Sequence, residues 1–484
     1  MPTLKRFTLS TFKHATLSLS LFAVVSAQAN NLPVIGDFSS SVISLGSEYS
    51  LGQGIVRNIR SSNASIDDPI VISYMQDLTW DLTSTSALQD KRISLEVLKY
   101  KSVNAFAAPG GILGFHAGLI VTAENEAQLA SVISHELAHL SQRHFAAQLE
   151  QQRISSPLAI ASMLTGLLAA SANPQAGAAI LTTGFANQAS SQLAFSRRNE
   201  QEADRIGMTN LVKAGYDPKA MPEMFNHLLD IQRLQGATPP EFLLTHPTSS
   251  ARIADTENRA EHLTPRKKIK QSIDFSIIKA RLEVKLAQNN KTSLNQFRAQ
   301  AKASPSAHNQ FRLALAYAQN RKNKEALALL KKLPNKWQQH LLVKLSKAEI
   351  YSADRQHQAA VKLLKQLNRV YPKHFAVQMV LAKTLLLAGE AKQSIKYLTQ
   401  VTSYAPDTVD AWYLLAEAYG LSGEKNRLHR ARIEYFLLIG QVDAARKQVN
   451  YARRERSITK NDSYKLDDLE DQISVVEGYF NTKY

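Results

Sequence analysis

The sequence contains no cysteine among its 484 residues. No disulfide can therefore stabilise the fold, no lipid can be attached through a cysteine, and a metal site must rely on histidine and carboxylate ligands. Long apolar runs are also missing. Residues 15–26 and 158–170 form the two clearest such runs, and both are shorter than the roughly 20 residues that a membrane-spanning helix needs.

Charged side chains are absent from one internal stretch. Between Arg153 and Arg197 there is no Asp, Glu, Lys or Arg, a gap of 43 residues. The segment 154–196 favours a buried helical hairpin that turns near residues 171–174. A mobile lid or a membrane-apposed surface near an active site is the other interpretation.

The N-terminus has the three parts of an export signal. Lys5, Arg6 and Lys13 precede the apolar run 15–26, and Ala27-Gln28-Ala29 supplies the small residues at which a signal peptidase cleaves. The sequence therefore predicts a signal peptide at residues 1–29 and a mature protein in the periplasm.

Charge is divided unevenly along the chain. Residues 1–265 carry 19 Lys and Arg against 22 Asp and Glu, a net charge of −3, whereas residues 266–484 carry 39 against 19, a net charge of +20. The basic half could attract acidic partners or membrane surfaces, although solvated basic helix faces are the commoner cause. Nucleic acid is not expected as a partner of an exported protein.

The second half repeats itself with a period of 34 residues. Four alanines, two glycines and two prolines recur at this spacing: Ala314, Ala348, Ala382 and Ala416, then Gly389 and Gly423, then Pro372 and Pro406. This period, with small residues in one helix and a glycine turn, is typical of tetratricopeptide repeats. Such repeats stack helix pairs into a superhelix, so residues 266–484 are predicted to form a partner-binding scaffold.

The first half is predicted to be mostly helical with a few strands. Strand-like segments lie at residues 93–98 and 106–119, the latter interrupted by Pro109-Gly110-Gly111. Helices are expected at residues 68–82, 196–214 and 221–234, and a long helix is expected at residues 123–150 after Thr122 as its N-cap.

The long predicted helix carries His135-Glu136-Leu137-Ala138-His139. Residues four apart share a helix face, so His135 and His139 can both present a ring nitrogen to one Zn²⁺. Glu136 lies roughly 100° further round the helix, where it could act as the general base of peptide hydrolysis. A surface pair of histidines is disfavoured, because apolar neighbours would bury these polar groups without partners.

A catalytic zinc site needs a third protein ligand and an open position for water. The metzincin pattern would place glycine at position 142 and histidine at position 145, but the sequence has Gln142 and Phe145, with His144 one residue short. A second helix offers Glu200 and Asp204 at i and i+4. Glu200 is the expected third ligand and Asp204 the acceptor that orients a histidine ring, whereas Glu202 points away.

Together these motifs resemble the M48 family of zinc metallopeptidases, in an exported form fused to tetratricopeptide repeats. The resemblance also rests on residues 104–111, 199–207 and 244–247. It implies an α+β, mostly helical fold: a zincin-type metallopeptidase domain with a small sheet at residues 30–265 and one Zn²⁺ per chain, followed by an α-solenoid of repeats at residues 266–484.

The resemblance further implies a zinc endopeptidase that degrades misfolded or stalled outer-membrane β-barrel proteins and assists their assembly, with the repeats contacting the barrel-assembly machinery. A different class of function stays open. The repeats could carry a binding or chaperone function while the peptidase site is mostly resting.

Two further positions follow from the resemblance. The segment 105–119 would be an edge strand beside the metal on which an extended substrate lies, with contacts from Asn104, Ala105, Phe106, Gly110 and Gly111. His246, in Thr245-His246-Pro247, could be a fourth zinc ligand in a resting state or a donor that stabilises an oxyanion. An ordinary sheet strand and a loop histidine without a role are the alternatives.

Overall fold

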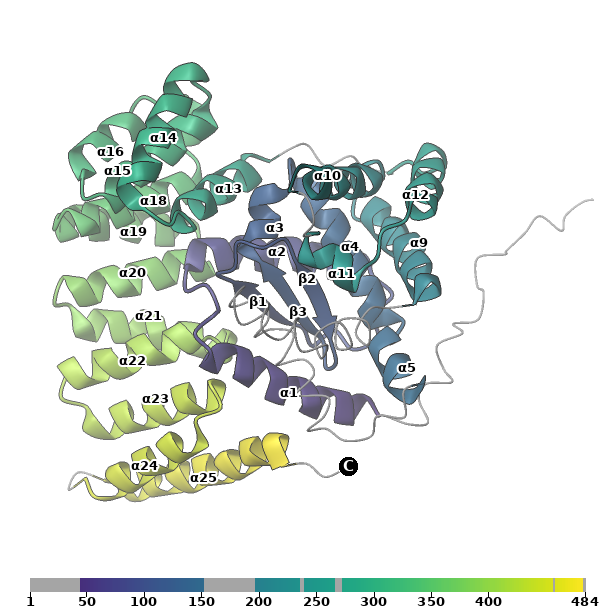
Figure 1. The fold of residues 1–484 in the computed structure, drawn as a ribbon. Helices are drawn as coiled ribbons and strands as arrows, with labels where there is room; N and C mark the ends of the chain where they lie inside the picture. The colour runs from purple at the N-terminus through teal and green to yellow at the C-terminus, as the bar shows by residue number, and fades with distance from the viewer. Residues whose placement is uncertain (1–43, 152–195, 236–238, 266–271, 456–457, 482–484) are drawn as a thin grey trace, which may run out of the picture.

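The computed structural model describes residues 44–151, 196–235, 239–265, 272–455 and 458–481. The expected signal peptide lies outside these residues, as does the uncharged segment apart from Ser196. A small sheet surrounded by helices forms one part, and a curved stack of helices forms the other (Figure 1). Within the described ranges, no helix combines the length and apolar character needed to cross a membrane.

The first part contains one three-stranded sheet and nine described helices. In chain order these elements are α1 (Leu45–Ser61), α2 (Pro69–Thr85), β1 (Ser94–Leu98), β2 (Ala105–Ala108), β3 (Ile112–His116), α3 (Ala117–Thr122), α4 (Glu126–Ser141), α5 (His144–Gln151), α9 (Arg197–Lys213), α10 (Ala220–Gln235), α11 (Glu241–Thr245) and α12 (Ser250–His262).

The sheet has the strand order β1-β3-β2, with β1 parallel and β2 antiparallel to the central strand β3. All five residues of β3 are buried, so the sheet lies inside the first part. The outer edge of β1 is itself paired, because Ile66 N donates to Val97 O at 2.7 Å and Lys99 N donates to Ala64 O at 2.8 Å. The strand at the other edge is β2.

The interrupted strand-like segment expected at residues 106–119 consists of two strands followed by a helix, so the strand prediction is wrong only for residues 117–119. Gly110 and Gly111 turn the chain with φ of 76° and 79°, a conformation that favours glycine, so β2 and β3 form a hairpin and only β2 is an edge strand. Residues 117–122 form the helix α3 instead of continuing the strand. A Cβ on Gly118 would lie 2.0 Å from the carbonyl oxygen of Lys101, so glycine permits this close approach.

The single helix expected at residues 123–150 is also wrong, because the structure has two helices there, α4 and α5. Thr122 ends α3, and the N-cap of α4 is Asn125, whose side chain accepts from Gln128 N at 3.0 Å. The helix ends at Ser141 because Arg143 has a φ of 52°, in the left-handed region that a helix cannot continue through. The chain therefore turns before α5 and brings His144 back toward the end of α4.

Three other helices agree with their predicted ranges to within a few residues: α2, α9 and α10. Asp68 caps α2 through hydrogen bonds from Ile70 N and Val71 N, and Ser196 caps α9. Helix α1 was not predicted.

The second part consists of helices that follow one another along a curved stack (Figure 1). These helices are α13 (Ile273–Lys285), α14 (Asn290–Ala303), α15 (Ala307–Gln319), α16 (Asn323–Leu330), α17 (Asn335–Gln338), α18 (Leu341–Ala353), α19 (His357–Val370), α20 (Phe375–Leu387), α21 (Ala391–Tyr404), α22 (Val409–Leu421), α23 (Lys425–Leu438), α24 (Val442–Arg453) and α25 (Lys460–Asn481).

The 34-residue period appears in the stack as equivalent positions. The four repeated alanines are all buried, in α15, α18, α20 and α22. The turn after each of these helices contains one residue with positive φ, and these residues are again 34 apart: Arg321, Arg355, Gly389 and Gly423. The sequence pattern revealed only the two glycines, because the first two repeats use arginine in the same conformation.

The stack packs against the first part at both ends (Figure 1). Near one end, Arg281 of α13 donates from Nε to Asp68 Oδ2 at 2.7 Å and from Nη2 to Glu349 Oε2 at 2.6 Å. Near the other end, Arg57 Nε of α1 donates to the carbonyl oxygen of Leu437 at 2.9 Å. Buried charged hydrogen bonds therefore fix the stack to the cap of α2 and to α1.

Replacing Arg281 should show how strongly this junction stabilises the chain. Arg281→Ala leaves the buried carboxylate of Asp68 without its main counter-charge, so we expect a loss of about 3–5 kcal/mol in the free energy of unfolding. Urea unfolding measures the effect, with Arg233→Ala as the control because the Arg233 side chain is 77% exposed. A loss no larger than that of the control would contradict a stabilising role for the Arg281 contacts.

Candidate metal centre

Helices α4 and α9 cross at the point where α4 carries His135. Gly207 of α9 makes the close crossing possible, because a Cβ at this position would lie 3.0 Å from Ser134 O and 3.1 Å from the His135 main chain. The crossing directs Glu200 and Asp204, one turn apart on α9, toward the histidines of α4. All of these side chains are at least 98% buried.

Four side chains bring their nitrogen and oxygen atoms to one point: His135, His139, Glu200 and His246. The Nε2 atoms of His135 and His139 are 3.0 Å apart, and His246 Nδ1 lies 3.4 Å from His135 Nε2. Glu200 Oε1 lies 3.4 Å from His139 Nε2 and 3.1 Å from His246 Nδ1. The structure thus brings together the predicted ligands of both helices and the predicted loop histidine.

These distances match the edges of a zinc coordination shell. Ligands placed tetrahedrally at about 2.0–2.1 Å from a zinc ion are about 3.3 Å from one another. The four separations given above, 3.0–3.4 Å, lie around this value, and all four donors lie within 4.8 Å of one another. Three imidazoles and one carboxylate are also donors that zinc accepts. The four side chains therefore fit a zinc ion.

Two further residues hold this donor set in place. Asp204 Oδ1 lies 3.0 Å from His135 Nδ1, which leaves Nε2 directed to the centre. Arg252 of α12 donates from Nε and Nη2 to the two oxygens of Asp204, each at 2.7 Å, and its Nη1 lies 2.7 Å from Glu200 Oε2. One guanidinium thus fixes both acidic side chains, as outer contacts of metal ligands commonly do.

The charges of the centre depend on these contacts. Burial opposes a charge on His135, but hydrogen bonds to Asp204 and Glu200 raise its pKa to about 9. Burial lowers the pKa of His139 well below its ordinary value, against the attraction of Glu200. Burial also opposes the ionised form of Asp204, yet hydrogen bonds from His135 and Arg252 lower the pKa of this carboxyl. A cation that binds here would displace the proton of His135.

His144 contacts His139, although its spacing of five residues along the sequence did not predict this contact. The turn at Arg143 puts His144 Nδ1 3.0 Å from His139 Nδ1, on the side of that ring away from the centre. His144 Nε2 in turn lies 3.5 Å from Glu202 Oε2. His144 and Glu202 therefore form an outer chain behind His139, as Asp204 and Arg252 do behind His135.

Glu136 lies beside the centre but does not belong to the group of four donors. Its side chain is completely buried, and its Oε1 is 3.5 Å from His246 Nε2. Burial raises the pKa of Glu136, while nearby His246 and His135 and the backbone of Ala107 in β2 lower it. A carboxyl with a raised pKa beside a metal centre is suited to proton transfer.

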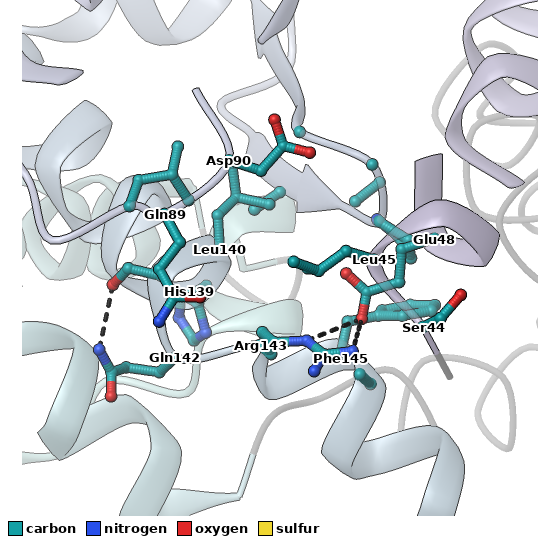
Figure 2. Close-up of a pocket in the computed structure, with 18 residues that line it drawn as sticks. Ser44, Leu45, Glu48, Gln89, Asp90, His139, Leu140, Gln142, Arg143 and Phe145 are labelled. Carbon is teal, nitrogen blue, oxygen red and sulfur yellow. Dashed lines mark hydrogen bonds and ion pairs between the residues drawn. The ribbon is translucent and has the colours of Figure 1, made fainter. Parts of the chain in front are cut away.

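A groove of about 430 Å³ leads from the surface to His139 (Figure 2). It is lined by the end of β2 and the following turn, by the first residues of α1 and by the end of α4. Arg143 Nη2 bonds Glu48 Oε1 at 2.7 Å and so links two of its walls (Figure 2).

The predicted substrate contacts divide between two places. Gly110 and Gly111 line the groove, together with Ala107 and Ala108 of β2. Asn104 is buried ahead of β2, and the Phe106 ring covers Gly114 of β3, where a Cβ would lie 2.1 Å from it. Ala105 is fully buried. These three residues position the strand instead of lining the groove.

Sequence reasoning missed Arg252, because nothing in the local pattern distinguishes it from other arginines of an amphipathic helix. Its position 48 residues after Asp204 becomes a contact only through the packing of α12. His144 was noted only as a misplaced ligand. The missing signal was the helix break, since a continuous helix would have placed His144 on another face from His139.

Comparisons with known proteins agree with both parts. Residues 72–260 match Peptidase family M48, and residues 351–424 match a tetratricopeptide repeat family. The Beta-barrel assembly-enhancing protease of Escherichia coli (strain K12) is 40% identical over 253 residues, which are 52% of this chain and 52% of that protein. The Putative beta-barrel assembly-enhancing protease of Vibrio cholerae is 35% identical over 55% of this chain and 54% of its own length.

A more distant relative is the Mitochondrial metalloendopeptidase OMA1 of Schizosaccharomyces pombe. It is 31% identical over 186 residues, which are 38% of this chain and 51% of that protein. The chain thus spans about half the length of the curated relatives it matches.

Removing Asp204 should weaken metal binding without removing a donor. Asp204→Ala frees the His135 ring to rotate and leaves Arg252 without its main partner, so we expect zinc affinity to fall about 10- to 100-fold. Competition with a chromogenic chelator measures this affinity. Asp255→Ala is the matched control, because Asp255 lies on α12 and pairs with Arg259 at the surface. Equal affinities of the two variants would contradict the orienting role of Asp204.

Proposed function

We propose that this chain, which contains a domain of peptidase family M48 and tetratricopeptide repeats, is a zinc-dependent endopeptidase. The observation that carries the proposal is the convergence of buried donors from His135, His139 and Glu200, with Glu136 beside them as a carboxylate outside the donor group. The first three residues would hold one Zn²⁺ per chain. We also propose that the metallopeptidase domain runs from residue 30 to 265 and the repeat domain from 266 to 484, after a signal peptide at residues 1–29.

The residues around the centre divide the work of peptide hydrolysis. A bound zinc ion supplies Lewis acidity and makes water acidic enough to lose a proton near neutral pH. Glu136 takes that proton on its carboxylate and later passes it to the leaving amine nitrogen. The raised pKa of Glu136 makes its carboxylate a stronger base for the first of these transfers. Asp204 and Arg252 keep His135 and Glu200 in position while this charge moves.

His246 would close the centre when no substrate is present. A catalytic zinc site keeps one coordination position open for water. A fourth protein donor such as His246 would occupy that position and exclude the water. We therefore infer that the arrangement with His246 Nδ1 against Glu200 is the resting one. The alternative role is that the ring, once moved aside, donates from Nε2, which now lies 3.5 Å from Glu136 Oε1, to the oxyanion of the reacting carbonyl.

The groove beside β2 suits an extended substrate. A peptide that adds to an edge strand takes its affinity from main-chain hydrogen bonds, so it need not have one particular sequence. Unassembled β-barrel proteins present such strands. The names of the E. coli and V. cholerae relatives point the same way. We propose that misfolded or stalled outer-membrane proteins are the substrates and that the protein acts in the periplasm.

The repeats would recruit partners, and we propose the barrel-assembly machinery as the main one. The net charge of +20 on residues 266–484 would also favour contact with an acidic membrane surface. A second function class finds support in the closed donor set. If His246 keeps the centre shut, the repeats could serve as a chaperone scaffold while cleavage is rare.

Glu136→Gln tests the enzyme proposal. The substitution keeps the shape of the side chain but cannot accept the proton, so we expect zinc near one per chain and cleavage of an unfolded protein reduced at least about 100-fold. Metal analysis and a casein-type assay measure the two quantities. Glu124→Gln, outside the centre and exposed, is the control. A wild-type protein without zinc, or a variant that cleaves normally, would refute the enzyme proposal.

His246→Ala tests the closing role. Loss of the fourth donor should make zinc dissociate faster, and it should raise turnover per zinc-loaded chain because the water position is always open. Cleavage rates are measured with zinc in excess and divided by bound zinc. Slower cleavage with normal zinc retention would instead assign His246 to the oxyanion. If neither zinc retention nor cleavage changes, both roles are withdrawn.

A further inference from the structure

The position of His246 is set by a helix of only five residues. Helix α11 ends at Thr245, and His246 is its C-cap, with its main-chain N donating to Phe242 O at 2.8 Å. The Phe242 ring is fully buried and stacks on the His246 ring with centroids 4.6 Å apart. A shift of α11 would therefore carry His246 with it.

The other end of α11 is attached to the segment that leads into β2. Phe242 N donates to Val103 O at 3.0 Å. Glu241 Oε2 lies 3.7 Å from His116 Nδ1, and Ser102 Oγ lies 2.8 Å from the same nitrogen. Burial raises the pKa of Glu241, while hydrogen bonds from Ser102 and Asn104 lower it. Four polar side chains thus meet where α11 touches residues 102–104.

This cluster is built into the centre of the sheet. His116 is the last residue of β3 and is completely buried, and its main-chain N donates to Asn104 O at 3.0 Å. Among the described residues, three atoms of this cluster have no hydrogen-bond partner: His116 Nε2, Asn104 Oδ1 and Glu241 Oε2. Such burial of polar groups costs stability. None of these residues belongs to the group of metal donors.

On its other side, His246 is held by a residue of the metal centre. Arg252 Nη1 donates to the carbonyl oxygen of Pro247 at 2.9 Å, while the same side chain bonds Asp204 and lies against Glu200. His246 is therefore placed between two attachments. One is fixed to the acidic residues of the centre, and the other is fixed to the start of β2.

We propose that Ser102, Asn104, His116 and Glu241 form a positioning cluster that holds α11 so that His246 reaches the metal. The inference rests on the proposed role of His246 as a fourth ligand. Because residues 102–104 continue directly into β2, a strand that docks on β2 acts on the same segment that anchors α11. Loosening the cluster lets His246 leave the centre, which links occupation of the edge strand to opening of the site.

The test is the rate of zinc release from the full chain to an excess of chelator, measured without substrate. Glu241→Ala is made both in the wild-type protein and in His246→Ala. We expect release about two- to tenfold faster in the first background, the effect of losing one or two hydrogen bonds, and no change in the second. Glu241→Gln, which keeps an acceptor oxygen, should restore most of the wild-type rate. Glu261→Ala, on the exposed face of α12, is the control.

Acceleration of the same size in both backgrounds would mean general loosening of the fold and would overturn the proposal, as would no acceleration in either. Ser102→Ala removes a single hydroxyl and repeats the comparison if Glu241→Ala does not fold. Because release is followed without cleavage, the measurement also works in Glu136→Gln. If Glu241→Ala speeds zinc release as expected but the wild-type protein cleaves no substrate, the peptidase proposal is refuted and the positioning cluster stands.

Discussion

The close crossing of α4 and α9 is the contact on which the rest of the first part depends. It places a carboxylate of one helix within hydrogen-bond distance of two imidazoles of the other, in an interior where an isolated charge would be costly. Each of these side chains has a polar partner behind it, within 3.0 Å. Asp204 and Arg252 support one side and His144 the other, so the donors are oriented before a cation arrives.

Much of this centre could be predicted because it follows from local periodicity. His135 and His139 share a face by their spacing, and Glu200 and Asp204 repeat the same spacing on a second helix. The spacing could not reveal which arginine would join them, because Arg252 is brought in by a later helix and a loop. Nor could it reveal the break at Arg143, since a non-glycine residue with positive φ leaves no clear mark in the sequence.

The same limit appears in the repeats. The buried alanines were recognised from their period, because each position needs a small side chain between packed helices. The turns were recognised only where glycine occupies them. Arg321 and Arg355 adopt the same backbone conformation, which shows that packing of the adjacent helices can impose it at some energetic cost.

The capped edge of β1 has a consequence for how copies of the protein behave toward one another. A sheet with two accessible edges can pass pairing from one molecule to the next and grow into a ribbon. Here residues 64–66 already occupy part of the outer edge of β1. A strand from another chain can therefore pair with β2, but no further strand can pair along the covered part of the β1 edge. The fold is in this way prevented from acting as a link between chains that pair edge to edge.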